Sequence, residues 1–191
     1  MANIYKSGST GDRVVVPRSA CSDNVGTANT GVTAVEYGDG YNHTTVLTVS
    51  QVDALTTGDN AALGDGYLLY TFPAGVILVN GSYMTMGMTA TTEQQADTPL
   101  VGLGTVIATG AVANLTTPAT FQDILTGQTA LADGTAEVMA LAPTAGAPFV
   151  ILSGAAHTVH FNVADTWADD TSGDLSADIA GTVVLNWTFL A

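Results

Sequence analysis

The chain has 191 residues, a length that suits one domain with a sizeable hydrophobic core and argues against two full domains. Its 17 acidic residues oppose only three basic ones, so the body repels the phosphate groups of nucleic acids and of anionic lipids. Hydrophobic residues make up 47% of the chain, but Thr, Gly, Asp or Ser interrupts them every few positions. No apolar run approaches the roughly 20 residues of a membrane-spanning helix, so we expect a soluble protein that binds neither nucleic acid nor membrane.

Met1–Asn29 is rich in Gly, Ser, Thr and Asn, and we interpret it as an extended arm before a domain that spans residues 30–191. All three basic residues of the chain fall in this arm, together with a short run of three valines. These features suit docking on a partner, and a merely disordered terminus is the alternative interpretation. The candidate partner-binding residues are Lys6, Arg13, Val14, Val15, Val16 and Arg18.

Two features of the N-terminal region bear on the cellular compartment. Met1–Ala20 contains no apolar segment of the kind that a secretory signal requires, so we expect the protein to accumulate inside the cell that makes it. Cys21 is the single cysteine, which excludes an intrachain disulfide. Stability must therefore come from packing.

The first part of the domain alternates apolar and polar residues and predicts a β-hairpin. Val32–Tyr37 and His43–Val49 are its strands, and the Gly-Asp-Gly between them supplies the turn. Ser50–Gly66 is polar and contains several glycines, so we expect a surface connection with one helical turn near Val52–Leu55.

The middle of the chain predicts further short strands. Tyr67–Phe72 and Val76–Val79 flank a Pro-Ala-Gly turn. Tyr83–Thr89 alternates so that three methionines share one face, where we expect them to fill the core. Leu100–Leu115 is a long apolar run broken by glycines, and it predicts one strand bent near Gly110 or two separate strands.

Pro118–Gly127 carries the clearest helix boundary signals and predicts a helix of two turns at most. Ala136–Leu141, Phe149–Ser153 and His157–Ala164 are further strand-like runs. The last of them alternates, with His157, Val159, Phe161 and Val163 on one face. The strand pattern dominates, so a helix in this region would be an exception within a β protein.

Ile179–Leu190 is the strand around which we expect the sheet to form. With period two it sends Val183, Trp187 and Phe189 to one face, and its lack of proline suits a central position. Together the runs predict an all-β fold, namely a single β-sandwich, jelly-roll-like or barrel domain with at most one or two short helical turns.

No constellation of side chains predicts catalysis or a cofactor. Gly102–Gly104 resembles the start of a dinucleotide-binding loop, but Ile107 stands where the third glycine belongs. His157 and His160 lie three apart on a predicted strand, so they point to opposite faces and cannot hold one metal ion. The G-x-S-x-G elbow of hydrolases is absent. We therefore expect no enzyme and no cofactor.

The loop Asp165–Asp178 concentrates carboxylates around a glycine. Hard oxygen ligands on one loop suit Ca²⁺, and the weak calcium candidates are Asp169, Asp170 and Asp174. Their spacing does not match the EF-hand pattern. A solvated acidic loop is therefore the preferred interpretation, and we expect no bound metal.

Five phrases of the sequence resemble small structural proteins of tailed bacteriophages, especially marine ones. These phrases are Leu69–Val79, Ala96–Ala113, Phe121–Ala130, Ala156–Trp167 and Gly181–Leu190. They consist of packing and turn residues, so the resemblance assigns no catalytic or binding residue. It implies a virion component made in the host cytoplasm, and in the first place a capsid decoration or cement protein on the capsid exterior.

The resemblance implies the major capsid protein as partner and a homo-oligomer on the shell, with a trimer favoured. Two other classes stay open. A major shell protein built from a single jelly roll would also be all-β, but more cations would be expected on its genome side. A tail-associated or receptor-binding domain, such as a calcium-dependent carbohydrate-binding module, would fit a sandwich with an acidic loop. The number of copies in purified particles separates shell from tail.

Overall fold

The computed structural model describes residues 23–57, 63–90, 100–129, 137–141, 149–153, 157–164 and 175–190. Within them the chain forms two antiparallel sheets. The five-stranded sheet has the order β1 (Thr27–Ala28), β4 (Gly64–Thr71), β10 (Thr158–Ala164), β6 (Leu100–Gly104) and β7 (Leu125–Thr129). The six-stranded sheet has the order β2 (Val32–Gly38), β3 (Asn42–Thr57), β11 (Leu175–Phe189), β5 (Gly75–Ala90) and β8 (Glu137–Leu141), and β9 (Phe149–Ser153) also pairs with β5.

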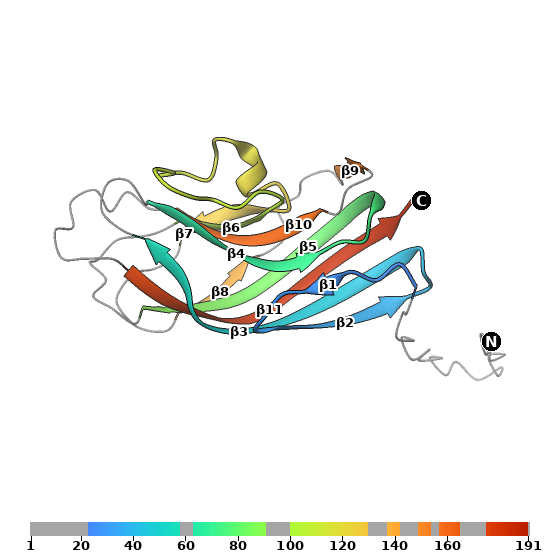
Figure 1. The fold of residues 1–191 in the computed structure, drawn as a ribbon, viewed down its shortest axis with the longest axis horizontal. Coiled ribbons are helices and arrows are strands. Elements are labelled where there is room, and N and C mark those ends of the chain that lie inside the picture. Colours follow the sequence, from blue (N-terminus) through green and yellow to red (C-terminus); the bar gives the residue numbers. More distant parts are fainter. Residues whose placement is uncertain are drawn as a thin grey trace, which may run out of the picture.

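The two sheets form two layers with one main hydrophobic core between them (Figure 1). Leu47 and Leu185 enter this core from the six-stranded sheet, and Leu69 and Phe161 enter it from the five-stranded sheet. All four side chains are fully buried. The prediction of an all-β, sandwich-like fold is confirmed.

Strand β11 occupies the centre of the six-stranded sheet, as the sequence predicts. It pairs with β3 on one edge and with β5 on the other. Val183 and Trp187 are buried on its inner face, whereas Phe189 is only half-buried. Gly181 has φ +150°, and a Cβ there would come within 2.2 Å of the Thr85 carbonyl oxygen. A glycine is therefore needed where β11 and β5 approach each other.

The predicted hairpin is present, but its second strand is longer than the sequence indicates. In the turn, Asp39 Oδ1 accepts hydrogen bonds from the backbone N–H groups of Tyr41 and Asn42. β3 then continues to Thr57, so the predicted helical turn near Val52–Leu55 is wrong. The start of β11 pairs with this extension, where Ala177 lies opposite the buried Leu55. A neighbouring strand thus stabilises a segment whose polar composition is typical of a loop.

Strand β5 joins two runs that the sequence separates, Val76–Val79 and Tyr83–Thr89. The join is marked by a shift in the register with β11, between Asn186 and Trp187. The predicted methionine face is confirmed, because Met84, Met86 and Met88 all belong to the core cluster. The polar residues between the two runs are tolerated because an irregularity in the ladder accommodates them.

The segment after β6 differs most from the predictions. Only Leu100–Gly104 of the predicted run forms a strand, and residues 105–124 fold over the outer side of the five-stranded sheet (Figure 1). The predicted helix Pro118–Gly127 is wrong. A single 3₁₀ turn, η1 (Ala119–Phe121), is followed by β7, since Ile124 donates its N–H to the Leu103 carbonyl and pairs the chain with β6. An isolated helix of two turns is unstable in water, so sheet pairing prevails here.

We expect Trp187→Ala to lower the free energy of unfolding by about 3–5 kcal/mol, because it empties a fully enclosed site on the central strand. Urea unfolding followed by circular dichroism measures the change. Leu190→Ala is the control, since this residue follows the same strand and is exposed. Equal losses in the two variants would contradict the central role of β11.

Candidate functional site

The residues singled out by the sequence as functional lie outside the described part of the chain. The predicted partner-binding residues Lys6, Arg13, Val14, Val15, Val16 and Arg18 fall within residues 1–22. The calcium candidates Asp169, Asp170 and Asp174 fall within residues 165–174. Both interpretations stay predictions. The described residues 23–29, which the sequence assigns to the arm, show how that segment meets the domain.

The root of the arm, residues 23–29, is held against both sheets. Asn24 donates from Nδ2 to the Gly40 carbonyl at 2.9 Å, at the turn between β2 and β3. Thr27–Ala28 forms β1 and pairs with β4. A Cβ on Gly26 would lie 2.3 Å from the hydroxyl of Tyr70 and from the Thr71 carbonyl oxygen, so a larger residue cannot sit there.

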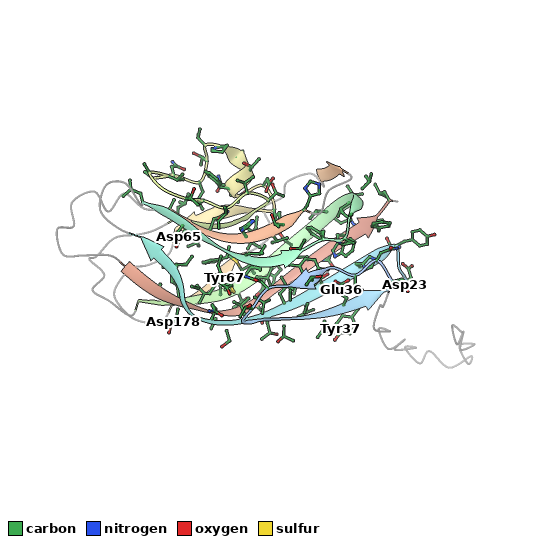
Figure 2. The ribbon with its side chains drawn as sticks, viewed as in Figure 1. Asp23, Glu36, Tyr37, Asp65, Tyr67 and Asp178 are labelled. Atoms are coloured by element: carbon green, nitrogen blue, oxygen red, sulfur yellow. The ribbon has the colours of Figure 1, made fainter. Side chains whose placement is uncertain are left out.

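A buried polar cluster, Glu36, His43 and Tyr70, lies against this root, because Glu36 and Tyr70 both bond to Gly26. Figure 2 shows Glu36 and Asp23, the first residue of the root, at the same end of the molecule. The Tyr70 hydroxyl donates to Glu36 Oε1, and the Gly26 N–H donates to the same carboxylate oxygen at 3.1 Å and to the Tyr70 hydroxyl at 2.8 Å. His43 Nδ1 lies 3.1 Å from Glu36 Oε2. The cluster therefore connects β2, β3 and β4 to the root of the arm.

Aromatic rings enclose the cluster on the core side. The His43 ring stacks on Trp187 with centroids 3.8 Å apart and an angle of 7° between the planes. Phe72 meets Trp187 edge to face, with centroids 5.3 Å apart. Trp187 Nε1 donates to Thr45 Oγ1 at 2.8 Å, so the indole of the central strand is satisfied. These contacts fix the orientation of the His43 ring.

Burial governs the electrostatics of the cluster. It raises the pKa of Tyr70, and the nearby Glu36 carboxylate raises that pKa further, because a phenolate there would be poorly solvated and repelled. Glu36 is 8% exposed and His43 is 3% exposed. The carboxylate oxygens are occupied by donors from the protein, and these groups are closed to solvent. The arrangement suits a structural clamp on the arm root rather than acid–base chemistry on a substrate.

A second polar cluster fastens residues 105–124 to the five-stranded sheet. Asn162 on β10 is fully buried, and its Oδ1 accepts the N–H of Ala108 at 2.9 Å. Its Nδ2 donates to the carbonyls of Val106 and Phe121, at 2.9 and 2.8 Å. Asp123 accepts hydrogen bonds from the N–H and the hydroxyl of Thr105, at 2.8 and 2.7 Å. Asn162 thus holds both ends of the covering segment on the sheet, and the pair of Asp123 and Thr105 joins these two ends to each other.

Neither cluster resembles a metal site. Among the described residues, no three or more His, Cys, Asp or Glu side chains are grouped so that they could hold a metal ion. The predicted inner face of β10 is confirmed by the buried Val159, Phe161 and Val163. His160 Nε2 lies 2.9 Å from the Thr158 hydroxyl, on the side of the strand that carries Asn162. The described helical structure includes nothing long and apolar enough to cross a membrane.

The chain was compared with protein-family models, with curated proteins and with solved structures, and no match was found in any of the three comparisons.

The sequence did not single out the Glu36 cluster. Its one signal is the alternation Val32, Ala34, Glu36, which places a carboxylate on the inward face of β2. An inward acidic residue in a hairpin indicates a buried partner, because an isolated buried carboxylate is very costly. Which residues supply the donors follows only from the packing of β4 against the hairpin.

We expect Tyr70→Phe to lower the free energy of unfolding by about 1–3 kcal/mol, because it takes a donor from a buried carboxylate and an acceptor from the Gly26 N–H. Amide hydrogen exchange at Gly26 should accelerate more than exchange in β11. Tyr41→Phe is the control, since Tyr41 is 65% exposed. If amide exchange at Gly26 were unchanged in Tyr70→Phe, it would contradict the role of Tyr70 in holding the root of the arm.

Asp123 provides a pH test of the second cluster. Burial raises its pKa, against the opposing hydrogen bonds from Thr105. Between the unfolded and folded pKa values the folded protein binds more protons, so the contribution of Asp123 is largest at low pH and is lost as the pH rises through the folded pKa.

Relative to Asp123→Asn, the wild-type protein should therefore gain stability as the pH falls from about 7 to about 4. Denaturant unfolding of both proteins at each pH measures this difference. Asp39→Asn is a control of opposite sign at lower pH: hydrogen bonds from Asn42 and Tyr41 lower the pKa of Asp39, so its contribution is constant from about pH 7 to about pH 4 and is lost only below about pH 4. If the stability difference between the wild-type protein and Asp123→Asn did not change with pH, it would contradict a raised pKa for Asp123.

Proposed function

We propose that this protein is a structural component of a bacteriophage virion, a decoration or cement protein that binds the outside of the head and stabilises the shell. The proposed partner is the major capsid protein, and the proposed state on the shell is a homo-oligomer, with a trimer favoured. The protein would be made in the host cytoplasm and would have no catalytic activity. The five sequence phrases that resemble small virion proteins motivate this proposal.

The anchored root of the arm is the observation that carries the proposal furthest. A flexible strap transmits force to a domain only if its base is fixed to that domain. Here Asn24 bonds to Gly40, and Gly26 bonds to Glu36 and Tyr70 in the interior. A pull on residues 1–22 would therefore act on three strands at once. This arrangement supports attachment through the arm.

The distribution of charge adds a second argument. All Lys and Arg residues of the chain lie in the first 18 positions, and every Asp, Glu, Lys or Arg position after them is acidic. Extended at about 3.3 Å per residue, a segment of this length spans several tens of ångströms. Its cations would accelerate the encounter with an acidic partner surface, while Val14–Val16 would pair with an exposed sheet edge of that partner.

Deletion of Met1–Pro17 should abolish binding to particles stripped of this protein and leave the domain folded. Neutral replacements of Lys6, Arg13 and Arg18 should slow binding and reduce its salt dependence, because rim ion pairs contribute only about 0–1 kcal/mol each. Add-back of each variant, quantified as copies per particle, measures both effects. The melting temperature of each free variant is the control for folding.

Saturation of stripped particles by the deletion variant at wild-type affinity would contradict attachment through the arm. The copy number in native particles tests the location. Hundreds of copies per virion support a shell component, whereas a handful would favour the tail-associated alternative.

A further inference from the structure

The outer surface of the six-stranded sheet carries side chains in regular rows across β2, β3, β11 and β5. One row consists of threonines, namely Thr33, Thr48, Thr182 and Thr85. The next row consists of Val35, Val46, Val184 and Tyr83. A third row consists of Tyr37, Thr44, Asn186 and Gly81. We call these three rows the neutral face.

The neutral face points away from the core. Residues of the same strands that alternate with it, such as Leu47, Val183 and Met84, are fully buried in the core. Val35 and Tyr83, at the two ends of the middle row, are each 43% exposed and rank among the most exposed large apolar side chains of the described residues. The face therefore presents apolar groups to solvent in a regular array.

No charged side chain occupies any position of the neutral face. Glu36 lies between Val35 and Tyr37 on β2 but points into the core. On the outer side, the described carboxylates nearest to the face along the strands are Asp39, in the turn after β2, and Asp178, near the start of β11. Figure 2 shows Asp178 and Tyr37 toward opposite ends of the sheet. The apolar middle of the face is thus bordered by acidic ends, as in a protein interface with a polar rim.

Hydrogen bonds within the face fix some of its side chains before any partner binds. Thr44 Oγ1 donates to Asn186 Oδ1 at 3.0 Å, which joins β3 to β11. Thr85 Oγ1 donates to the Tyr83 hydroxyl at 2.7 Å, which directs the tyrosine ring along β5. A surface whose rotamers are already restricted loses less conformational entropy when it is covered.

We propose that the neutral face is a self-association surface and that its occupant is the neutral face of a second copy of this protein. A two-fold interface uses the same patch twice, so its groups must be complementary to themselves. Hydroxyl groups both donate and accept hydrogen bonds, and Val and Tyr bury apolar area against their own kind. A cationic partner would be attracted to the carboxylates elsewhere on the body.

Charge also selects this face over the rest of the surface. Two bodies that each carry a net charge of −14 repel each other wherever carboxylates meet. Contact through the neutral face keeps Asp39 and Asp178 at the rim, where water and salt screen them. Added salt should therefore strengthen this association, whereas it should weaken docking of the basic arm on an acidic partner.

The size of the face sets the expected strength. The three rows span five residues of each strand. Four strands spaced about 4.8 Å apart and five residues of about 3.3 Å each give roughly 320 Å² of flat sheet per copy. Two such faces bury roughly 650 Å² together, which is less than the about 1,200 Å² of a standard specific interface. We therefore expect a weak, concentration-dependent dimer in solution that is favoured where copies are crowded. This pairing is separate from the trimer proposed on the shell and does not depend on a virion role.

Sedimentation velocity of the full chain tests the proposal over a range of protein concentrations, in about 20 mM and about 500 mM NaCl. The wild-type protein should form dimers whose dissociation constant falls at the higher salt concentration. Val35→Glu and Thr182→Glu should each raise that constant about tenfold or more, because every dimer then receives two facing carboxylates. Val106→Glu is the matched control, since Val106 is also 43% exposed but lies on the other sheet's covering segment.

Melting temperatures within a few degrees of wild type would show that each variant is folded. Tyr83→Phe is a milder additional variant, and it should leave dimerisation intact. A wild-type protein that stays monomeric at both salt concentrations would overturn the proposal. Dimers that persist in both Val35→Glu and Thr182→Glu, or that Val106→Glu disrupts equally, would overturn it too. The assay contains no phage particle, so its failure is distinct from failure of the proposed virion role.

Discussion

The structure depends first on the double pairing of β11, the strand that closes the described chain. Its ladder with β3 runs from Leu175 to Thr188 and its ladder with β5 from Ala177 to Phe189, so both edges are occupied along nearly the whole strand. Its inner face supplies Val183, Leu185 and Trp187 to the core. Among the described strands, β11 alone joins β3 to β5, so this six-stranded sheet requires β11. Contacts between residues so far apart in sequence make folding slow to nucleate, because long loops must close first.

The Glu36 cluster shows how the same core tolerates charge. A carboxylate in the interior is costly unless donors satisfy it, and here Tyr70, Gly26 and His43 surround its oxygens. All three groups come from other strands or from the arm root, so the cost of burial is fully offset only when the root is in place. Electrostatics thus couples the position of residues 23–28 to the packing of Trp187, which stacks on His43. A structural clamp of this kind fixes the root of the arm to the domain.

The two outer surfaces of the sandwich differ in a way that bears on function. Residues 105–124 cover the five-stranded sheet, and a small satellite core of Ala108, Leu115, Phe121 and Ala164 seals that contact. The six-stranded sheet has the neutral face instead. The two sides of the domain are therefore chemically distinct: one is covered by a chain segment, and the other presents the neutral face. If the arm binds one partner and the neutral face binds a second copy, the two contacts respond oppositely to salt, because one joins unlike charges and the other brings like charges together.

Alternation with period two determined much of this fold from the sequence alone. It predicted the hairpin, the methionine face of β5, the inner face of β10 and the central β11, since each has one face that must be buried. The alternation pattern gave wrong predictions where strand pairing, rather than local composition, determines the secondary structure. β3 extends through a polar stretch because β11 pairs with it. The end of the predicted helix pairs with β6 from Ile124 onward instead of continuing a helix, because Ile124 and Leu125 gain burial there. The Glu36 cluster and the neutral face also required tertiary structure, because donors from different strands, and rows across strands, follow from register, which a single sequence does not contain.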